Sequence, residues 1–349
     1  MFFASDNGGP AHPSVIEALA DANTGYTGGY GADDTTARAA AAVREVFEAP
    51  DAAVHFVPTG TAANSLALAS YTQPFQTVFC SDTAHIHEDE CNAPEFYTGG
   101  AKLTLVPTTD GRMTPDALRD TIAGEGTRGV HGPQRGPVSI TQITERGTIY
   151  SRGDLTALCE VAKDFGLPVH LDGARFANAL VELDCTPAEM TWKAGVDVVS
   201  FGGTKNGLMG AEAVVFFDPE KAREFEFRRK RGGHLFSKHR YLSAQFLPYL
   251  DGGRWLDLAR AANASRLRLQ DGMRGLNDVG FAYEPSGNMM FPILRAGDHR
   301  RLFDAGAIYH IYDGQLDGAH DDDRLTARLV CDWSMTEDGV DRFLHVLRG

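Results

Sequence analysis

Short apolar runs rich in Val, Ile and Phe alternate along the chain with longer stretches in which Ala, Leu and Glu recur at helical spacing. Short apolar runs that lie between helices are typical of strands buried on both faces of a parallel sheet. The pattern therefore predicts an α/β fold built on a mainly parallel, seven-stranded sheet. The predicted strands are Val54–Val57, Thr77–Cys80, Leu103–Val106, Val138–Gln142, Pro168–Leu171, Val196–Phe201 and Ala213–Phe217, and the helices between them include Ala62–Tyr71, Thr114–Ile122, Arg152–Phe165 and Thr186–Ala194.

The pattern changes after the seventh strand. A basic helical stretch at 220–250 leads into a second helix at 254–276, and weaker strand-like segments follow at 289–294 and 329–333, before a terminal helix at 337–347. This mixture predicts a smaller α+β domain behind the large one. The expected parts are an N-terminal arm at 1–14, a large domain at 15–245 and a small C-terminal domain at 246–349.

Charge and cysteine usage narrow the possible partners and the environment. Lys and Arg total 33 and Asp and Glu total 47, which gives a net charge of −14. Such a chain is repelled by nucleic acids and by anionic membranes, so we expect neither as a partner. The five cysteines are scattered without a CxxC pair, which favours reduced thiols over disulfides or structural zinc. With no secretory signal and no apolar run long enough to span a membrane, we expect a soluble, cytoplasmic protein.

Three strand ends carry residues that could bind one ligand, because ligands bind beyond the carboxyl ends of parallel strands. Gly60 and Thr61 begin a helix whose free N–H groups suit a phosphate, although an ordinary capped turn is equally consistent. Asp172 and Arg175 could hold a protonated nitrogen and an anion, or form only a local ion pair. Lys205 lies in a glycine-rich loop that lets a bulky group approach the backbone; the alternative is a solvated lysine.

Together these strand ends meet the needs of pyridoxal 5'-phosphate. This cofactor requires a phosphate cradle, an anion at its pyridine nitrogen and a lysine for its aldehyde. The combination is more specific than any of its parts, so we predict this cofactor. The spacing of His85, His87, Asp89 and Glu90, and the run Asp321–Asp323, do not match metal ligands, and we expect no metal site.

Longer motifs in the same order make the chain resemble the L-threonine aldolases among the fold-type-I pyridoxal-phosphate enzymes, in the branch of low-specificity and phenylserine aldolases. The resemblance covers nearly the whole chain. It implies reversible cleavage of L-threonine, L-allo-threonine or related β-hydroxy-α-amino acids such as phenylserine to glycine and an aldehyde. The motifs are Phe3-Ala4-Ser5-Asp6-Asn7, Gly60-Thr61-Ala62-Ala63-Asn64-Ser65-Leu66, Ala84-His85 with Asp89-Glu90-Cys91, Asp172-Gly173-Ala174-Arg175-Phe176, Trp192-Lys193-Ala194-Gly195-Val196-Asp197 and Phe201-Gly202-Gly203-Thr204-Lys205-Asn206-Gly207.

The resemblance implies roles at the cofactor. Lys205 would bond the cofactor aldehyde, and Asp172 would pair with the pyridine nitrogen. Gly60 and Thr61 would hold the phosphate, and His85 would stack on the ring.

It also implies roles at the substrate and between subunits. Arg175 would contact the cofactor oxygen and the substrate carboxylate, with Ser5 and Arg328 as further carboxylate contacts. Tyr30 would reach a neighbouring subunit's site, and Lys230 would meet the partner's phosphate, unless it belongs only to a solvated basic helix face. We therefore expect a homo-oligomer with shared active sites, a dimer at least and by family pattern a tetramer.

The base that accepts the β-hydroxyl proton is left open. His85 is one candidate, with Asp89 to orient it or to bind the hydroxyl, and water is another. Many relatives carry a second active-site histidine where this chain has Thr144-Glu145, so Glu145 is the third. Two further departures, Asn92 for an expected Gly and Ala32 for an expected Asp, bear on substrate preference.

Other functions remain to be weighed against aldol cleavage. The nearest is another fold-type-I enzyme acting on amino acids, such as a β-eliminating lyase or a transaminase. A non-catalytic binding protein on the same scaffold, or a metal-dependent aldolase, would belong to different classes. Product analysis distinguishes an aldolase from a β-eliminating lyase or a transaminase. Retained activity after chelation excludes a metal-dependent aldolase.

Overall fold

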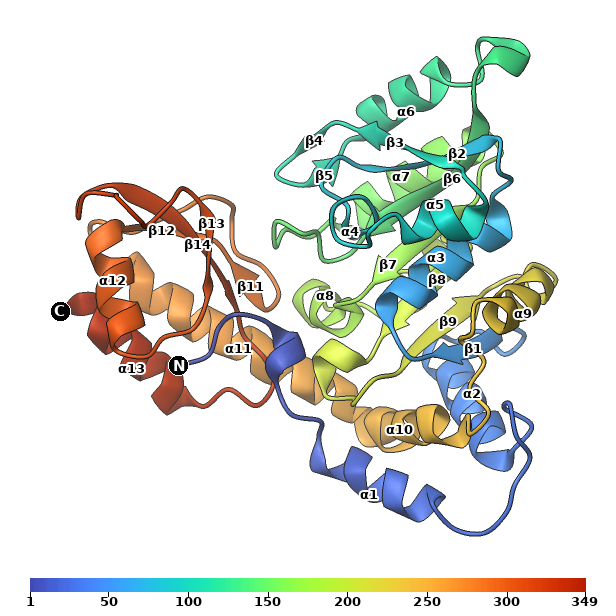
Figure 1. Ribbon diagram of the computed structural model, residues 1–349, viewed down its shortest axis with the longest axis horizontal. Coiled ribbons are helices and arrows are strands. Elements are labelled where there is room, and N and C mark those ends of the chain that lie inside the picture. The colour runs from blue at the N-terminus through green and yellow to red at the C-terminus, as the bar shows by residue number, and fades with distance from the viewer.

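The computed structural model describes residues 1–349 and confirms the predicted sheet. Seven strands lie in the order β1-β9-β8-β7-β6-β2-β3 (Figure 1). Only β9 runs antiparallel to its two neighbours, and every other pair is parallel. The strands are β1 Ala53–Val57, β2 Gln76–Ser81, β3 Lys102–Val106, β6 Gln134–Thr141, β7 Val169–Gly173, β8 Val198–Gly202 and β9 Glu212–Phe216, with a separate hairpin of β4 Thr108–Thr109 and β5 Arg112–Met113.

Helices cover both faces of this sheet, which explains why its strands read as apolar runs. In β8, Val198 packs toward α3 and α9, whereas Val199 and Phe201 belong to the larger core on the opposite face. That larger core also takes apolar residues from α2, α6, α7, α8 and α10. The helices of this part are α1 Pro13–Ala22, α2 Asp34–Val46, α3 Gly60–Tyr71, α4 His85–Glu88, α5 Ala93–Thr98, α6 Pro115–Gly124, α7 Arg152–Asp164, α8 Phe176–Leu183, α9 Ala222–Arg231 and α10 Arg240–Leu250.

A second, antiparallel sheet lies toward the C-terminus, at the left of Figure 1. Its strand order is β10-β12-β14-β11, and β13 pairs with β14. None of the helices in the molecule has the length and apolar character to cross a membrane. The elements of this part are α11 Arg254–Arg274, β10 Gly280–Phe281, β11 Met289–Met290, β12 Pro292–Arg295, α12 Ala296–Asp304, β13 His310–Asp313, β14 Arg324–Val330 and α13 Glu337–Arg348.

The N-terminal arm connects the two sheets. Phe3 is fully buried in the core of the small sheet and packs edge-on against Phe343, with ring centroids 4.9 Å apart. The Val330 N–H donates to the Phe3 carbonyl at 2.9 Å. A single 3-10 turn at Asp6–Gly8 then leads to α1, which packs on α10. The expected division at 245/246 falls within α10 and stays a prediction.

The helix predicted at Thr186–Ala194 is wrong. Thr186 Oγ1 does accept the Glu189 N–H at 3.2 Å, as in a helix cap. The chain then leaves helical geometry at Thr191, where φ is −128° and ψ is −108°, and only a 3-10 turn at Trp192–Ala194 follows. The Thr191 hydroxyl donates to the Pro187 carbonyl at 2.6 Å, and such local bonds offer the backbone an alternative to helix.

Candidate active site

The predicted strand ends meet at one cavity. Gly60 at the start of α3, Asp172 in β7 and Lys205 after β8 line it together. Glu212, the first residue of β9, lies in the same wall. Parallel strands present their carboxyl ends on one edge of a sheet, which is why residues so far apart in sequence converge here.

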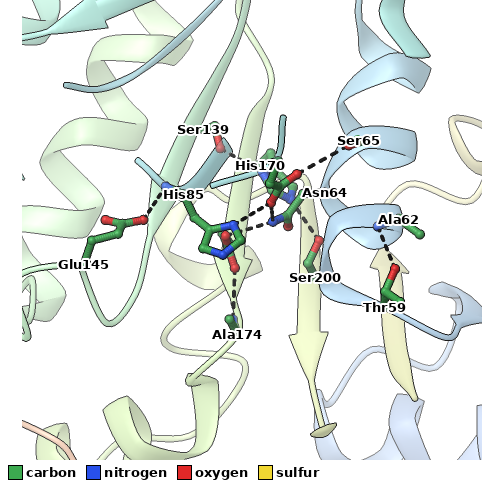
Figure 2. A network of polar contacts seen from close by, with 12 residues as sticks. Thr59, Ala62, Asn64, Ser65, His85, Ser139, Glu145, His170, Ala174 and Ser200 are labelled. Carbon is green, nitrogen blue, oxygen red and sulfur yellow. Dashed lines mark hydrogen bonds and ion pairs between the residues drawn. The ribbon is translucent and has the colours of Figure 1, made fainter. Parts of the chain in front are cut away.

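The start of α3 has the features of a phosphate cradle. Thr59 Oγ1 accepts the Ala62 N–H at 3.2 Å (Figure 2), which fixes the first turn. Gly60 and Thr61 are the first two helical residues, so their N–H groups have no carbonyl partner within the helix. A Cβ atom built on Gly60 would meet nothing within 4 Å, so open space lies above these donors. An anion of phosphate size therefore fits here.

Asp172 is held in a fixed orientation. Its Oδ2 accepts an N–H of the Asn64 side chain at 2.9 Å, and its Oδ1 accepts the Ala174 backbone N–H at 3.0 Å. Beside it on β7, His170 bridges the hydroxyls of Ser139 and Ser200, each at 3.0 Å (Figure 2). Burial lowers the pKa of His170 to about 4, so this imidazole is neutral and does not neutralise the charge of Asp172. These contacts leave a buried carboxylate available to a protonated ring nitrogen.

Lys205 lies among charges of both signs. Burial and the Arg175 guanidinium lower the pKa of the Lys205 amine, against the opposing effect of Asp6, Asp172 and Glu212. A lowered pKa favours the neutral amine, which is the nucleophilic form. The geometry therefore suits covalent attachment of an aldehyde.

His85 is oriented by Glu90 and not by Asp89. The His85 Nδ1 lies 2.9 Å from Glu90 Oε1, and Asn64 donates to the same oxygen at 2.9 Å. Glu90 is buried, whereas Asp89 is exposed, because α4 ends at Glu88 and the chain turns inward only after Asp89. The hydrogen bond to Glu90 is the main reason that the pKa of His85 lies above its usual value. The Asp89 charge acts instead on Arg328, where with Asp6 it opposes the lowering of the Arg328 pKa by burial and Arg175.

Glu145 approaches His85 from the other side (Figure 2). Its Oε1 accepts the His85 backbone N–H at 2.6 Å, and its buried Oε2 has no hydrogen-bond partner. Burial raises the pKa of Glu145 to about 7, with a smaller contribution from Asp172. A carboxylate with a free oxygen and a near-neutral pKa is suited to proton transfer.

The residues expected to bind the substrate carboxylate are Arg175, Arg328 and Ser5. They differ in whether a group of the protein already bonds to their side chains. Asp6 already pairs with Arg175, accepting from Nε at 2.7 Å and from Nη2 at 2.9 Å. Arg328 has no carboxylate partner, and its one hydrogen bond is a long one of 3.4 Å to the Ala4 carbonyl. Burial and Arg175 lower the pKa of Arg328 to about 10. Ser5, next to Asp6, caps the 3-10 turn by accepting the Asn7 N–H at 3.1 Å.

Tyr30 and Lys230 are not part of this cavity. The Lys230 ammonium lies 4.5 Å from the centre of the Tyr30 ring, and both line a separate surface pocket. Within one chain they therefore do not reach Lys205. Their expected roles in a neighbouring subunit stay predictions.

Sequence reasoning missed four residues of the site: Asp6, Asn64, Glu90 and Glu212. The first three stand inside the quoted motifs, so their presence was visible, but their partners lie far along the chain. Asp6 and Arg175 are separated by 169 residues, and Asn64 and Asp172 by 108. No set of three or more His, Cys, Asp or Glu side chains is grouped to hold a metal ion.

Comparison with known proteins places the chain in a family. The family model described as beta-eliminating lyase matches residues 3–300. A low-specificity L-threonine aldolase of Pseudomonas aeruginosa is 40% identical over 99% of this chain and 96% of its own. The solved structure of a Leishmania major threonine aldolase superposes with a TM-score of 0.92 at 27% identity, covering 99% of this chain and 98% of that one. A Sphingomonas wittichii serine palmitoyltransferase shares the fold at 16% identity, with a TM-score of 0.71 and coverage of 99% and 86%.

These similarities run through the whole chain and confirm the fold-type-I architecture that the resemblance implied. Most of the residues that line the cavity stand in the motifs that carry the resemblance. The chain belongs to the beta-eliminating lyase family and is a member of the low-specificity L-threonine aldolases.

Proposed function

We propose that the protein is a pyridoxal 5'-phosphate-dependent aldolase that cleaves β-hydroxy-α-amino acids to glycine and an aldehyde. One observation carries the proposal. Lys205, Asp172 and the free N-terminus of α3 line a single cavity, and they match the aldehyde, the ring nitrogen and the phosphate of this cofactor. Substrates would include L-threonine, L-allo-threonine and phenylserine, in line with the printed name of the Pseudomonas relative.

When bound, pyridoxal phosphate supplies an electron sink for the negative charge left at Cα after the Cα–Cβ bond breaks. The chain's own residues make that sink effective. The Asp172 carboxylate holds a proton on the ring nitrogen, because an anion beside a cation favours the charged form. Lys205 holds the aldehyde carbon, and Gly60 and Thr61 would bind the phosphate through their backbone N–H groups.

Substrate orientation is assigned to two guanidinium groups and one hydroxyl. Arg328 has no carboxylate of its own and binds that of the substrate. Arg175 uses only two of its five N–H donors on Asp6, so the others remain for the cofactor oxygen and the same substrate carboxylate. Ser5 completes this end of the site.

Two groups are placed to accept the β-hydroxyl proton. His85 donates from Nδ1 to Glu90, which leaves the Nε2 lone pair as the acceptor. Glu145 offers the unpartnered Oε2. Loss of a general base costs about 10² to 10⁴ in rate, so the His85→Ala and Glu145→Gln variants would identify which group acts.

The remaining parts of the proposal concern assembly and location. We propose a homo-oligomer, a dimer at least and a tetramer by family pattern, in which Tyr30 and Lys230 complete a neighbouring site. We also propose that it works in the cytoplasm.

Product analysis tests the proposed reaction against its nearest rival, β-elimination. The family model's description favours that rival as second candidate. The purified protein is incubated with pyridoxal phosphate and L-threonine, L-allo-threonine, phenylserine or L-serine, with and without a chelator. We expect glycine and the matching aldehyde from the first three, unaffected by chelation. Ammonia and a 2-oxo acid in place of glycine would overturn the proposal.

A further inference from the structure

Glu212 is a buried carboxylate that none of the roles above uses. It opens strand β9, is 6% exposed and lines the same cavity as Lys205. Its Oε2 accepts the Gly203 N–H at 2.7 Å, and its Oε1 accepts the Thr204 hydroxyl at 2.6 Å. Both donors come directly before Lys205 in the chain. The carboxylate therefore ties the loop that carries the lysine to the neighbouring strand.

Three anions act on Lys205, and Glu212 is the one left without a cation once the cofactor ring nitrogen is assigned to Asp172. Asp6 accepts hydrogen bonds from Nε and Nη2 of Arg175. Asp172 is held by Asn64 and by the Ala174 N–H, facing the position assigned to the cofactor ring nitrogen. Glu212 has hydrogen bonds only from neutral donors.

The influences on the pKa of Glu212 agree with this pairing of charges. Burial raises the pKa of Glu212 to about 7, while the loop donors and the charge of Lys205 act in the opposite direction. A buried carboxylate stays ionised most readily when a cation faces it. Lys205 is the cation that remains to do so.

We propose that Glu212 is a positioning residue for Lys205: its hydrogen bonds to Gly203 and Thr204 fix the lysine loop, and its charge balances the Lys205 nitrogen whenever that nitrogen is protonated. This inference rests on the proposed function, in which Lys205 bonds pyridoxal phosphate. The Glu212 carboxylate would thus both hold the lysine loop by hydrogen bonds and supply a negative charge near Lys205.

Two variants separate these tasks. Glu212→Gln keeps the size and one acceptor but removes the charge. Thr204→Val removes the hydroxyl contact, and with it one donor that favours the ionised Glu212, but leaves the carboxyl group in place. Asp298→Asn is the matched control, because Asp298 is a buried carboxylate bonded to Arg295 and Arg301 in the small domain.

Each protein is freed of cofactor and titrated with pyridoxal phosphate, and the visible absorption of the bound cofactor is followed against pH. For Glu212→Gln we expect binding about tenfold weaker and an absorption midpoint about one pH unit lower, because an anion that favours the protonated nitrogen has been removed. Thr204→Val should bind a few-fold more weakly, with a midpoint shift smaller than that of Glu212→Gln because the carboxyl group is still present. Asp298→Asn should match the wild type in both.

The pH midpoint tests the role of Glu212 separately from the proposed function. A Glu212→Gln midpoint equal to that of the wild type overturns the counter-charge, even if binding is weaker. Should that variant not fold, Glu212→Asp decides instead: a lowered midpoint supports the inference, since the charge has moved away from Lys205, and an unchanged one overturns it. A wild-type protein that binds no pyridoxal phosphate through Lys205 would overturn the proposed function itself.

Discussion

Arg175 and Arg328 show how two like residues in one site take different energetic parts. Arg175 is 9% exposed and its charge is matched by Asp6, so removing it strands a buried carboxylate. Arg328 is half-buried and has no carboxylate to strand. The first residue therefore supports the structure as well as the substrate, and the second serves mainly the substrate.

This difference predicts that two matched variants lose stability to different extents. Arg175→Gln should lower the free energy of unfolding by about 3–5 kcal/mol, the cost of breaking a buried pair from one side. Arg328→Gln should change unfolding by less than about 1 kcal/mol and raise the KM for L-threonine at least about tenfold, since one charge-assisted contact to the carboxylate is lost. Denaturant unfolding and steady-state kinetics check both. Equal losses of stability would contradict the assignment.

Glu145 makes stability depend on pH in a direction that can be worked out. Its pKa is about 7 in the folded protein against an ordinary 4.5, so the folded state binds more protons between these values. Stability contributed by this group is therefore present at low pH and lost as the pH rises toward 7.

Glu145→Gln lacks this group and should not lose that stability. Its free energy of unfolding, taken relative to that of the wild type, should therefore rise by about 3 kcal/mol from mildly acidic to mildly alkaline pH. Paired denaturant titrations at the two ends of this range measure the change. A difference between variant and wild type that does not vary with pH would show that Glu145 is ionised normally.

At the scale of elements, the sequence pattern predicts the large sheet well because fully buried strands must be apolar along their whole length. All seven predicted strands form it, with ends shifted by a few residues. The helix predicted at Thr186–Ala194 does not form, because a cap starts a turn without ensuring that the helix continues. The hydrogen bond from the Thr191 hydroxyl to the Pro187 carbonyl accompanies the departure from helical geometry. The pairings Asp6–Arg175 and His85–Glu90 escape prediction because they depend on tertiary geometry, and Asp89 and Glu90 cannot be told apart until the turn after α4 is known.

The N-terminus of α3 can be tested against a helix with the same cap away from the site. Thr59 caps α3 and Thr114 caps α6, each accepting a backbone N–H at 3.2 Å. Thr59→Ala and Thr114→Ala should each cost about 1 kcal/mol of stability. Only Thr59→Ala should weaken pyridoxal phosphate binding, by about fivefold if the same free energy is lost at the phosphate. An equal effect of both variants on cofactor affinity would contradict the cradle.

On the scale of the whole molecule, the residues that line the cavity all come from the large-sheet part of the chain, and the N-terminal arm contributes Asp6 beside it through Arg175. Tyr30 and Lys230 lie together outside this cavity. Phe3 anchors the arm in the small core, and Asn288 beside β11 donates to Asp6 at 3.0 Å. Tyr30 and Lys230 are both exposed, and neither lines the cavity. A neighbouring subunit is where we expect them to act.

Subunit complementation tests that expectation. Lys205→Ala and Lys230→Ala should each have little activity alone. Mixed in equal amounts and reassembled, they should recover up to about a quarter of wild-type activity, because half of the random pairs contain one site with both lysines intact. Dissociation and remixing of each variant alone provides the control. Without recovery in confirmed hybrids, Lys230 does not serve a partner's site.

Aldol cleavage by this protein requires that Lys205 carries pyridoxal phosphate, and absorption and turnover measured on the same samples test this requirement. The visible absorption of the purified protein with pyridoxal phosphate is recorded, and glycine release from L-threonine is measured on the same samples, for the wild type and for Lys205→Ala. We predict that the wild type shows both the absorption and glycine release, that Lys205→Ala loses both, and that His85→Ala keeps the absorption. An unchanged absorption band in Lys205→Ala, or glycine release by that variant at the wild-type rate, would show that Lys205 does not carry the cofactor.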